Sequence, residues 1–376
     1  MGGTNQGATT TWAPPPTTPT TPIQRPRVIT VTLNAAIDTR LTVEAIRPGT
    51  VTRASRGERS PGGKGLNVAR VAVQLGAPVL ATGFLAGHAG RFISEQLTHT
   101  GIDQRFVWVE GESRTCLNLI DAGGRSTEVL EPGVDITPDQ LAGLESLVVS
   151  LISPGDAVVF SGSLPPGCPP DTYARLIRAA RAAGALTVLD SSGEPLRQAL
   201  TAHPDVIKPN AEEASALTGR QIDSPADAAA LARTLGCDHG IAAVVCSLGG
   251  NGAVLACDQG AWWAEPPTIQ PLNTVGCGDA LVAGLSTALV EGRGAALLGR
   301  AGATLAGGTG ATLLEDAGAS APDHWARCLV DAVTVATAAA LSATTGSVDR
   351  SDLDQVRRRG VRLHDTGESV ECEWST

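Results

Sequence analysis

The chain has 376 residues and a formal net charge of −10, with 38 acidic against 28 basic side chains. An acidic chain of this kind is not expected to bind nucleic acid, and no run of 18 or more uncharged apolar residues indicates a membrane span. Hydrophobic residues make up 42% of the chain and aromatic residues only 3%, so Ala, Val, Leu and Ile must fill the core, which suits an α/β fold. The N-terminus lacks the basic start and apolar centre of a secretory signal, so we expect a cytoplasmic protein.

The chain begins with a segment of biased composition and continues with alternating strands and helices. Residues 1–26 are rich in Thr, Pro and Gly, and we expect a disordered tail because so few apolar side chains cannot offset the entropy of ordering. A single domain is expected at 27–365 and a polar C-terminal tail at 366–376. Buried strands are expected at 28–33, 79–84, 157–160, 186–190, 205–208 and 242–246.

Helical spacing separates several of these strands. Apolar residues recur at i, i+3, i+4 and i+7 over 68–75 and over 173–180, and a further helix is expected at 331–343. Strands and helices in alternation predict a doubly wound, mostly parallel sheet flanked by helices. The Gly- and Ala-rich stretch at about 292–320 is either an inserted loop or a weak helix.

Two segments interrupt this alternation. Residues 38–59 and 106–131 are rich in Thr, Val, Arg and Glu, with short alternations of apolar and polar side chains, which predict a small separate antiparallel sheet. Eight cysteines are scattered along the chain without a CxxC pair. We therefore expect reduced thiols, and neither a zinc site nor a disulfide framework.

A glycine-rich turn leads into the helix expected at 68–75. Its glycines allow a ligand to approach the backbone closely, and the start of the helix offers free N–H groups. The turn contains Lys64, and only one other of the 28 basic residues, Lys208, is a lysine. This composition suits an anionic or polyhydroxyl ligand, although a glycine-rich turn can also be only a flexible connection. The motif reads Pro61-Gly62-Gly63-Lys64-Gly65-Leu66-Asn67.

A second glycine-rich turn precedes a helix whose buried face is marked by Leu281 and Leu285. A Gly-x-Gly turn at a helix N-terminus directs backbone N–H groups to a point where negative charge is stabilised. Asp279 is either an ordinary acidic residue of the first helical turn or a general base beside that anion hole, placed to take a proton from a hydroxyl. The motif reads Asn273-Thr274-Val275-Gly276-Cys277-Gly278-Asp279.

The two motifs together resemble the two signatures of the ribokinase-like PfkB carbohydrate kinase family. Within that family the chain is most similar to the branch that phosphorylates sugar phosphates, which contains 1-phosphofructokinase and tagatose-6-phosphate kinase. The resemblance implies a ribokinase-like fold with a small β-sheet lid, formed by about 38–59 and 106–131. It covers about residues 28–363 and is carried by four further runs, at 32–38, 161–165, 208–213 and 247–252.

The resemblance implies a site for the sugar phosphate beneath the lid. Asp38 would accept hydrogen bonds from sugar hydroxyls, and Arg114 would clamp the phosphate that the sugar already carries. Gly63, Lys64 and Asn67 would approach the sugar and that phosphate, with Lys64 acting as a point charge. From the residues alone, Asp38 fits an Asx turn as well. Arg114 likewise fits a solvated strand residue.

A neighbouring site for ATP and Mg²⁺ is also implied by the resemblance. Lys208 would reach the nucleotide phosphates, while Asn210 and Glu213 would organise Mg²⁺, largely through water. The spacing of Asn210 and Glu213 fits a helix capping box equally well. The nucleotide itself would lie along a glycine-rich turn that could otherwise be an ordinary hairpin turn. The residues concerned are Ser247, Leu248, Gly249, Gly250, Asn251 and Gly252, together with Gly278.

The activity implied by the resemblance is in-line transfer of the γ-phosphoryl group of ATP to a phosphorylated ketohexose. The first candidate for this acceptor is fructose 1-phosphate, which would give fructose 1,6-bisphosphate. Asp279 would be the general base, and the amides of Gly276, Cys277, Gly278 and Asp279 would form the anion hole. The lid would close over the substrate and provide the surface of a homodimer. The alternatives are a kinase for tagatose 6-phosphate or fructose 6-phosphate and, in another class, a catalytically silent sugar-phosphate sensor.

Two positions in the second motif depart from the family pattern. Asn273 stands where many members carry Asp, which puts the local hydrogen-bond or ion arrangement in doubt. Cys277 stands where Ala is usual between the two glycines. Because a helix N-terminus lowers the pKa of a thiol, we expect Cys277 to be sensitive to oxidation.

Overall fold

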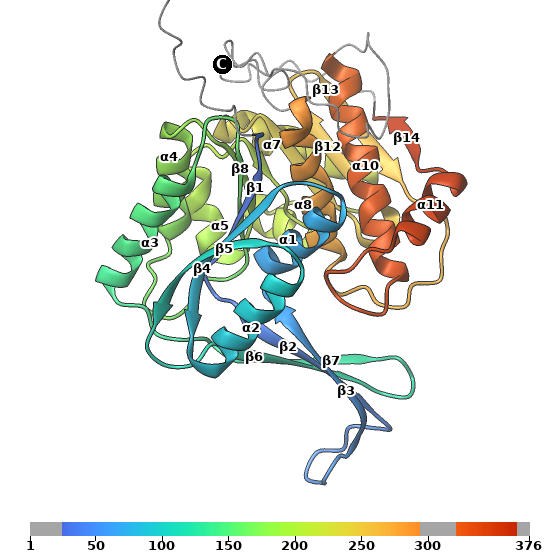
Figure 1. Ribbon diagram of the computed structural model, residues 1–376. Coiled ribbons are helices and arrows are strands. Elements are labelled where there is room, and N and C mark those ends of the chain that lie inside the picture. Colours follow the sequence, from blue (N-terminus) through green and yellow to red (C-terminus); the bar gives the residue numbers. More distant parts are fainter. Residues whose placement is uncertain (1–24, 294–320, 367–376) are drawn as a thin grey trace, which may run out of the picture.

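Figure 1 shows the computed structural model of the chain, which describes residues 25–293 and 321–366. The tails expected at 1–26 and 366–376 and the insertion expected at 292–320 lie almost wholly outside these residues. Within the described ranges, no helix is long and apolar enough to cross a membrane. The expectation of a cytoplasmic location stays a prediction.

The body of the molecule is built on a ten-stranded sheet. All six expected buried strands are present, each within two residues of the expected ends. From β11 to β5 the strands are parallel, and β12 to β14 add an antiparallel edge. In spatial order they are β14 (Arg362–Asp365), β13 (Gly260–Glu265), β12 (Ala253–Cys257), β11 (Ala243–Ser247), β10 (Val206–Ile207), β9 (Leu186–Asp190), β8 (Ala157–Ser161), β1 (Val28–Thr32), β4 (Val79–Ala86) and β5 (Asp103–Val109).

Helices cover both faces of this sheet, and each layer has its own apolar core (Figure 1). One face carries α1 (Lys64–Gln74), α2 (Gly87–His99), α8 (Cys277–Ala288), α10 (Ala321–Leu341) and α11 (Arg350–Arg359). The other carries α3 (Pro138–Leu151), α4 (Thr172–Ala182), α5 (Gly193–Leu200), α6 (Ala211–Thr218) and α7 (Pro225–His239). The helix expected at 331–343 is the C-terminal half of α10. A π-helical turn, Leu289–Arg293, follows α8, and a 3-10 turn, Gly249–Asn251, joins β11 to β12.

A four-stranded sheet projects from one end of the body (Figure 1). Its order is β3 (Ala54–Gly62), β2 (Ala36–Val43), β6 (Arg114–Ile120) and β7 (Ser126–Leu130). This sheet, called the small sheet below, is mixed and not antiparallel throughout, because β2 and β6 run parallel.

The segment expected at 106–131 is too long for the small sheet. Its first residues belong to β5, which pairs in parallel with β4 at the edge of the large sheet. β5 is an edge strand, and six of its seven residues are half-buried or exposed. A strand of a small half-buried sheet has the same partial burial.

Six cysteines of the described residues are reduced, as we expected from the sequence. Cys116, Cys168, Cys246, Cys257, Cys277 and Cys328 are free. Cys237 differs from this expectation, because it is disulfide-bonded.

The topology leaves one place in the large sheet suited to ligands. The chain runs from β1 to its neighbours β4 and β5 on one side, and then returns to β8 on the other side of β1. The strand order therefore reverses at β1. In open α/β sheets, ligands bind beyond the carboxyl ends of the strands at such a reversal.

Candidate active site

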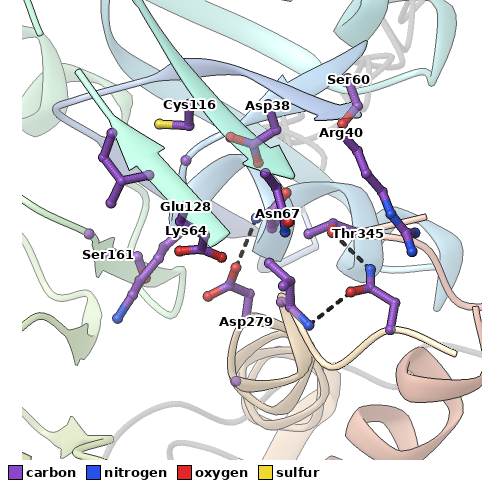
Figure 2. Close-up of a pocket in the computed structure, with 18 of the residues that line it drawn as sticks. Asp38, Arg40, Ser60, Lys64, Asn67, Cys116, Glu128, Ser161, Asp279 and Thr345 are labelled. Atoms are coloured by element: carbon purple, nitrogen blue, oxygen red, sulfur yellow. Dashed lines mark hydrogen bonds between the residues drawn. The ribbon is translucent and has the colours of Figure 1, made fainter. Parts of the chain in front are cut away.

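A cavity of about 780 Å³ lies at the carboxyl ends of β1, β8, β9, β10 and β11, where the small sheet faces the body (Figure 2). Both glycine-rich motifs reach it, although they are far apart in the sequence. The residues that we predicted from the sequence and that line this cavity are Asp38, Gly63, Lys64, Asn67, Arg114, Lys208, Asn210, Ser247, Gly249, Gly276, Gly278 and Asp279.

A second cavity, of about 750 Å³, adjoins the first and shares Ser247, Gly249 and Gly278 with it. The turn between β11 and β12 forms one wall, through Gly250, Asn251 and Gly252, and Cys277 also lines it. Leu248 lines neither cavity, and its side chain packs against the core, so its part in a nucleotide site stays a prediction. Glu213 likewise lines neither cavity.

Asp279 is held in the first turn of α8, where the residue is only 6% exposed. The helix begins after Gly276, whose φ of 84° is left-handed, and a side chain at 276 would come within 2.7 Å of a methyl carbon of Thr345. Asn67 Nδ2 donates a hydrogen bond of 2.9 Å to Asp279 Oδ2 (Figure 2). The amide of Asn67 therefore fixes the orientation of the carboxylate from the opposite helix, α1.

The surroundings of Asp279 disfavour its ionised form. Burial raises the pKa of Asp279 to about 7, and the nearby carboxylate of Asp190 contributes to this increase. Lys64, Asn67 and Lys208 act in the opposite direction, because they stabilise the anion. A carboxyl group with a pKa near 7 exchanges a proton readily at neutral pH, as a general base must.

The two lysines of the chain converge on one carboxylate oxygen. Lys64 Nζ lies 3.1 Å from Asp190 Oδ1, and Lys208 Nζ lies 3.3 Å from the same atom. Asp190 ends β9 and is 1% exposed, and Lys208, just after β10, is 4% exposed. Burial opposes the charge of Lys64, but the carboxylates of Asp190, Asp279 and Glu213 outweigh it and hold the pKa of Lys64 above its usual value. The Lys64 ammonium group therefore stays charged beside Asp279.

The small sheet brings opposite charges to the other end of the cavity. Arg114 Nε donates to Asn34 O and Arg114 Nη1 to Glu131 O, both at 3.2 Å, so two carbonyl groups hold the guanidinium beside the cavity. Burial raises the pKa of Asp38 to about 6, and Arg114 is the largest opposing influence. Glycine is needed at 62, because a side chain there would come 2.1 Å from the Asp38 carboxyl carbon.

The NxxE pair forms the capping box that its spacing also fits. Glu213 N donates to Asn210 Oδ1 at 2.8 Å, and Asn210 N donates to Glu213 Oε2 at 2.9 Å, at the start of α6. Within residues 25–293 and 321–366, no three His, Cys, Asp or Glu side chains are grouped to hold a metal ion by themselves. Asp190 Oδ2 is buried without a hydrogen-bond partner in the described structure, so a carboxylate oxygen is available beside Lys208. These oxygen donors suit a hard cation that keeps most of its water.

Cys277 corrects the expectation of a reactive thiol. Burial raises its pKa to about 11, with a further contribution from the carboxylate of Asp279. Its Sγ lies 3.8 Å from Asn273 O, as a weak donor, and its amide donates to Thr274 O at 3.4 Å. The desolvation of a buried thiolate therefore outweighs the favourable field of the helix N-terminus.

The cavity is also lined by residues that sequence reasoning missed, and these include Asp190, Arg40 and Thr345. The available signal for Asp190 was a carboxylate at the end of a buried strand, followed directly by a Ser-Ser-Gly turn. No local pattern marks Arg40 or Thr345.

Comparison with known sequences identifies relatives over most of the chain. Residues 29–322 match the family model described as pfkB family carbohydrate kinase. The tagatose-6-phosphate kinase of Staphylococcus epidermidis is 37% identical over 262 residues, which cover 69% of this chain and 84% of that enzyme.

Solved structures share the same architecture. Phosphofructokinase-2 from Escherichia coli, in complex with substrates and products, has a TM-score of 0.76 at 28% identity, over 88% of this chain and 98% of that one. The tetrameric inhibited form of that enzyme has a TM-score of 0.75 at 27% identity, with the same coverage of 88% and 98%. A Thermotoga maritima protein, described as a possible 1-phosphofructokinase, has a TM-score of 0.70 at 25% identity, over 90% of this chain and 99% of that one.

Proposed function

The chain belongs to the pfkB family of carbohydrate kinases, and we propose that it transfers the γ-phosphoryl group of ATP to a ketohexose monophosphate, giving a ketohexose bisphosphate. One observation carries the proposal: a buried carboxyl group with a pKa near 7, Asp279, lies at a helix N-terminus beside two lysines. This arrangement supplies a proton acceptor for the attacking hydroxyl and positive charge for the transferring group.

Asp279 Oδ1 or Oδ2 would accept the hydroxyl proton as the new O–P bond forms and the bond to the ADP oxygen breaks. Negative charge on the transferring group would be stabilised by the first-turn amides of α8, which have no partner within the helix. Gly278 has no side chain, and the position of a Cβ there lies 3.6 Å from Lys208 Nζ. The Lys208 ammonium group therefore lies beside the same helix start, where it would contact the nucleotide phosphates.

Mg²⁺ fits this site as an ion that arrives with the nucleotide. Asn210 and Glu213 would hold it largely through water, and the free Oδ2 of Asp190 offers a further acceptor for that water. Bound there, the ion would offset the charge of the β- and γ-phosphates.

The sugar phosphate would lie beneath the small sheet. Asp38 would accept hydrogen bonds from its hydroxyls, while Gly63 and Lys64 would approach the ring and Arg114 would clamp the phosphate. The guanidinium of Arg114 is already held by two carbonyl groups, so little freedom is lost when it binds the phosphate. For this reason we expect a phosphorylated sugar to be preferred over an unphosphorylated one.

The adenosine part of ATP would occupy the second cavity. The wall formed by Gly250, Asn251 and Gly252 suits the close approach of a flat ligand, and the shared residues Ser247 and Gly249 connect this cavity to the phosphates.

Fructose 1-phosphate is our first candidate for the acceptor, from the overall pattern of motifs. Tagatose 6-phosphate is the second candidate, favoured by the 37% identity to a tagatose-6-phosphate kinase, and fructose 6-phosphate is the third. In all three sugars the existing phosphate and the acceptor hydroxyl lie at opposite ends of the ketohexose. A single site with a phosphate clamp at one end and a base at the other therefore serves each of them.

A coupled ADP-release assay across fructose 1-phosphate, fructose 6-phosphate, tagatose 6-phosphate and fructose tests the proposal. We expect one of the phosphorylated sugars to give the highest kcat/KM and fructose the lowest. A preference for fructose would contradict the role of Arg114. Lack of turnover with all four would favour the catalytically silent sensor.

The small sheet also suggests how two copies would meet. By strand alternation, Leu41, Leu119 and Val129 share the face turned away from the cavity, and Val129 is 53% exposed. We propose a homodimer through this face.

A further inference from the structure

A short loop after α10 contacts both halves of the active site. This segment, residues 342–346, lines the first cavity through Ala343, Thr344 and Thr345. At Gly346 the φ is 67°, and a side chain there would come within 3.0 Å of both Arg70 Nη1 and Asn67 Oδ1. The 342–346 loop is therefore packed tightly against α1, next to the residue that orients Asp279.

On the sugar side, the loop is joined to the small sheet by two arginines. Arg70 Nη1 donates to Thr345 O at 3.0 Å and to Pro61 O, in β3, at 3.2 Å. Arg40, from β2, donates to Ala343 O. Burial raises the pKa of Asp38, and the guanidiniums of Arg114 and Arg70 both act against it, so Arg70 also lies within the field of the sugar site.

On the phosphoryl-transfer side, the loop holds the turn before α8. Asn273 Nδ2 donates to Thr345 Oγ1 at 3.0 Å, and Asn273 Oδ1 accepts from Val275 N at 3.1 Å. Leu272 N donates to Ala340 O at 2.8 Å, which ties the same turn to the end of α10. Val275 directly precedes the Gly276 that begins the helix of Asp279.

Taken in order, these bonds form a continuous path from β3 to the start of α8. Each step joins two different elements: Pro61 to Arg70, Arg70 to Thr345, and Thr345 to Asn273. A displacement of the small sheet on closing must therefore move the loop or stretch one of these bonds. Either result changes the geometry of the turn that supplies the anion hole.

We propose that Arg70 and Thr345 are positioning residues, which couple closure of the small sheet over the sugar phosphate to the turn that binds the transferring phosphoryl group. This inference rests on the proposed function. Because coupling between two sites is reciprocal, the sugar phosphate and the nucleotide each raise the affinity for the other.

Thr345→Val is the sharpest test, because it keeps the shape of the side chain and removes the acceptor of the Asn273 amide. Arg70→Met breaks the neighbouring step of the path. Thr334→Val is the matched control: Thr334 is a buried residue of α10 whose hydroxyl donates to Val330 O in its own helix, and it lines neither cavity.

The measurement is the dissociation constant of the hexose phosphate that the wild type phosphorylates fastest, determined by calorimetry with and without Mg²⁺ and AMP-PNP. We expect AMP-PNP to tighten sugar-phosphate binding by at least about 5-fold in the wild type and in Thr334→Val. In Thr345→Val we expect this ratio to fall towards one, while binding without nucleotide changes by less than about 3-fold.

Turnover by the wild type together with an unchanged ratio in Thr345→Val and Arg70→Met overturns the coupling alone. A wild-type ratio of one also overturns it. If Arg70→Met does not fold, Thr345→Val decides the question by itself. Absence of turnover with every sugar phosphate overturns the proposed function and the coupling with it.

Discussion

Asp279 lies where burial and a second carboxylate both disfavour its ionised form. A carboxyl group whose pKa is raised on folding stabilises the fold at low pH, and this contribution is lost as the pH rises through the folded pKa. At pH 8 the ionised Asp279 carboxylate therefore lowers the free energy of unfolding. Such a cost is characteristic of catalytic groups, which are selected for chemistry and not for stability.

We predict from this that kcat/KM rises with pH through about 7, because Asp279 accepts the proton only when it is ionised. Asp190→Asn removes the neighbouring negative charge, so the acid limb of the pH profile should move to lower pH while kcat falls. A profile measured from pH 5.5 to 9 checks both effects. An acid limb that stays in place in Asp190→Asn would contradict the electrostatic link between the two carboxylates.

Asp279→Asn separates catalysis from stability. We predict a loss in kcat of at least about 100-fold, since general-base catalysis contributes about 10²–10⁴. The Tm of the variant at pH 8 should equal or exceed that of the wild type, because the ionised buried group is gone, and the difference should be smaller at pH 6. Steady-state assays and thermal denaturation at the two pH values test this. A variant that is both less stable and still active would contradict the assignment.

The residues of the site differ in how far the sequence predicts them. Asp279 and Lys64 belong to contiguous glycine-rich motifs, so local spacing identifies them. Asp190 belongs to the site because it contacts Lys64 and Lys208. Lys64 is 126 residues away in the sequence, so no local pattern shows this contact. The sequence pattern predicts that Cys277 lies at the helix N-terminus, but it does not show the burial that raises the pKa of the thiol.

At the scale of elements, the turn between β11 and β12 shows how backbone geometry builds the second cavity. Gly252 has a φ of +83°, and a Cβ there would come 2.0 Å from Ala264 O. Gly250, two residues earlier, has no atom within 4 Å of a Cβ position. Position 252 therefore requires a glycine, whereas position 250 has room for a larger side chain.

We predict that Gly252→Ala lowers Tm by several degrees, because the new methyl group forces β12 and β13 apart in a strained conformation. Gly250→Ala is the matched comparison and should leave Tm within about 1 °C. Thermal denaturation of both variants without ligands provides the test. Equal effects on Tm would show that the turn is not under the constraint described.

The strands that are buried along their whole length can be predicted from the sequence. The central strands are apolar along their whole length, so a short apolar run marks each of them. The edge strand β5 was assigned to the small sheet because its partial burial imitates that of a lid strand. The NxxE pair satisfied the capping interpretation in the structure, whereas its part in holding Mg²⁺ stays a prediction.

At the scale of the whole molecule, the net charge and the local charge of the site have opposite tendencies. A chain of net charge −10 that binds two phosphorylated ligands gains no attraction from its overall field. Positive charge is instead brought together from α1 and from the end of β10 onto Asp190. The two lysines were expected in separate phosphate sites, and the structure joins them through this one buried carboxylate.

The proposed homodimer gives a prediction at the same scale. Val129→Glu places a charge on the outer face of the small sheet, so we expect the variant to elute as a monomer. The wild type should have twice the chain mass of 38.2 kDa. Size-exclusion chromatography with light scattering distinguishes these outcomes. A monomeric wild type, or an unchanged dimer in the variant, would exclude this face as the interface.

The central claim is that the protein moves a phosphoryl group from ATP to a sugar phosphate. Phosphorus NMR of a reaction with ATP, Mg²⁺ and the preferred hexose phosphate measures this directly. The account predicts that the γ-phosphate signal of ATP is replaced, in equal amount, by a new phosphomonoester signal of a hexose bisphosphate. Release of inorganic phosphate without bisphosphate, or no loss of ATP with any of the sugar phosphates, would contradict it.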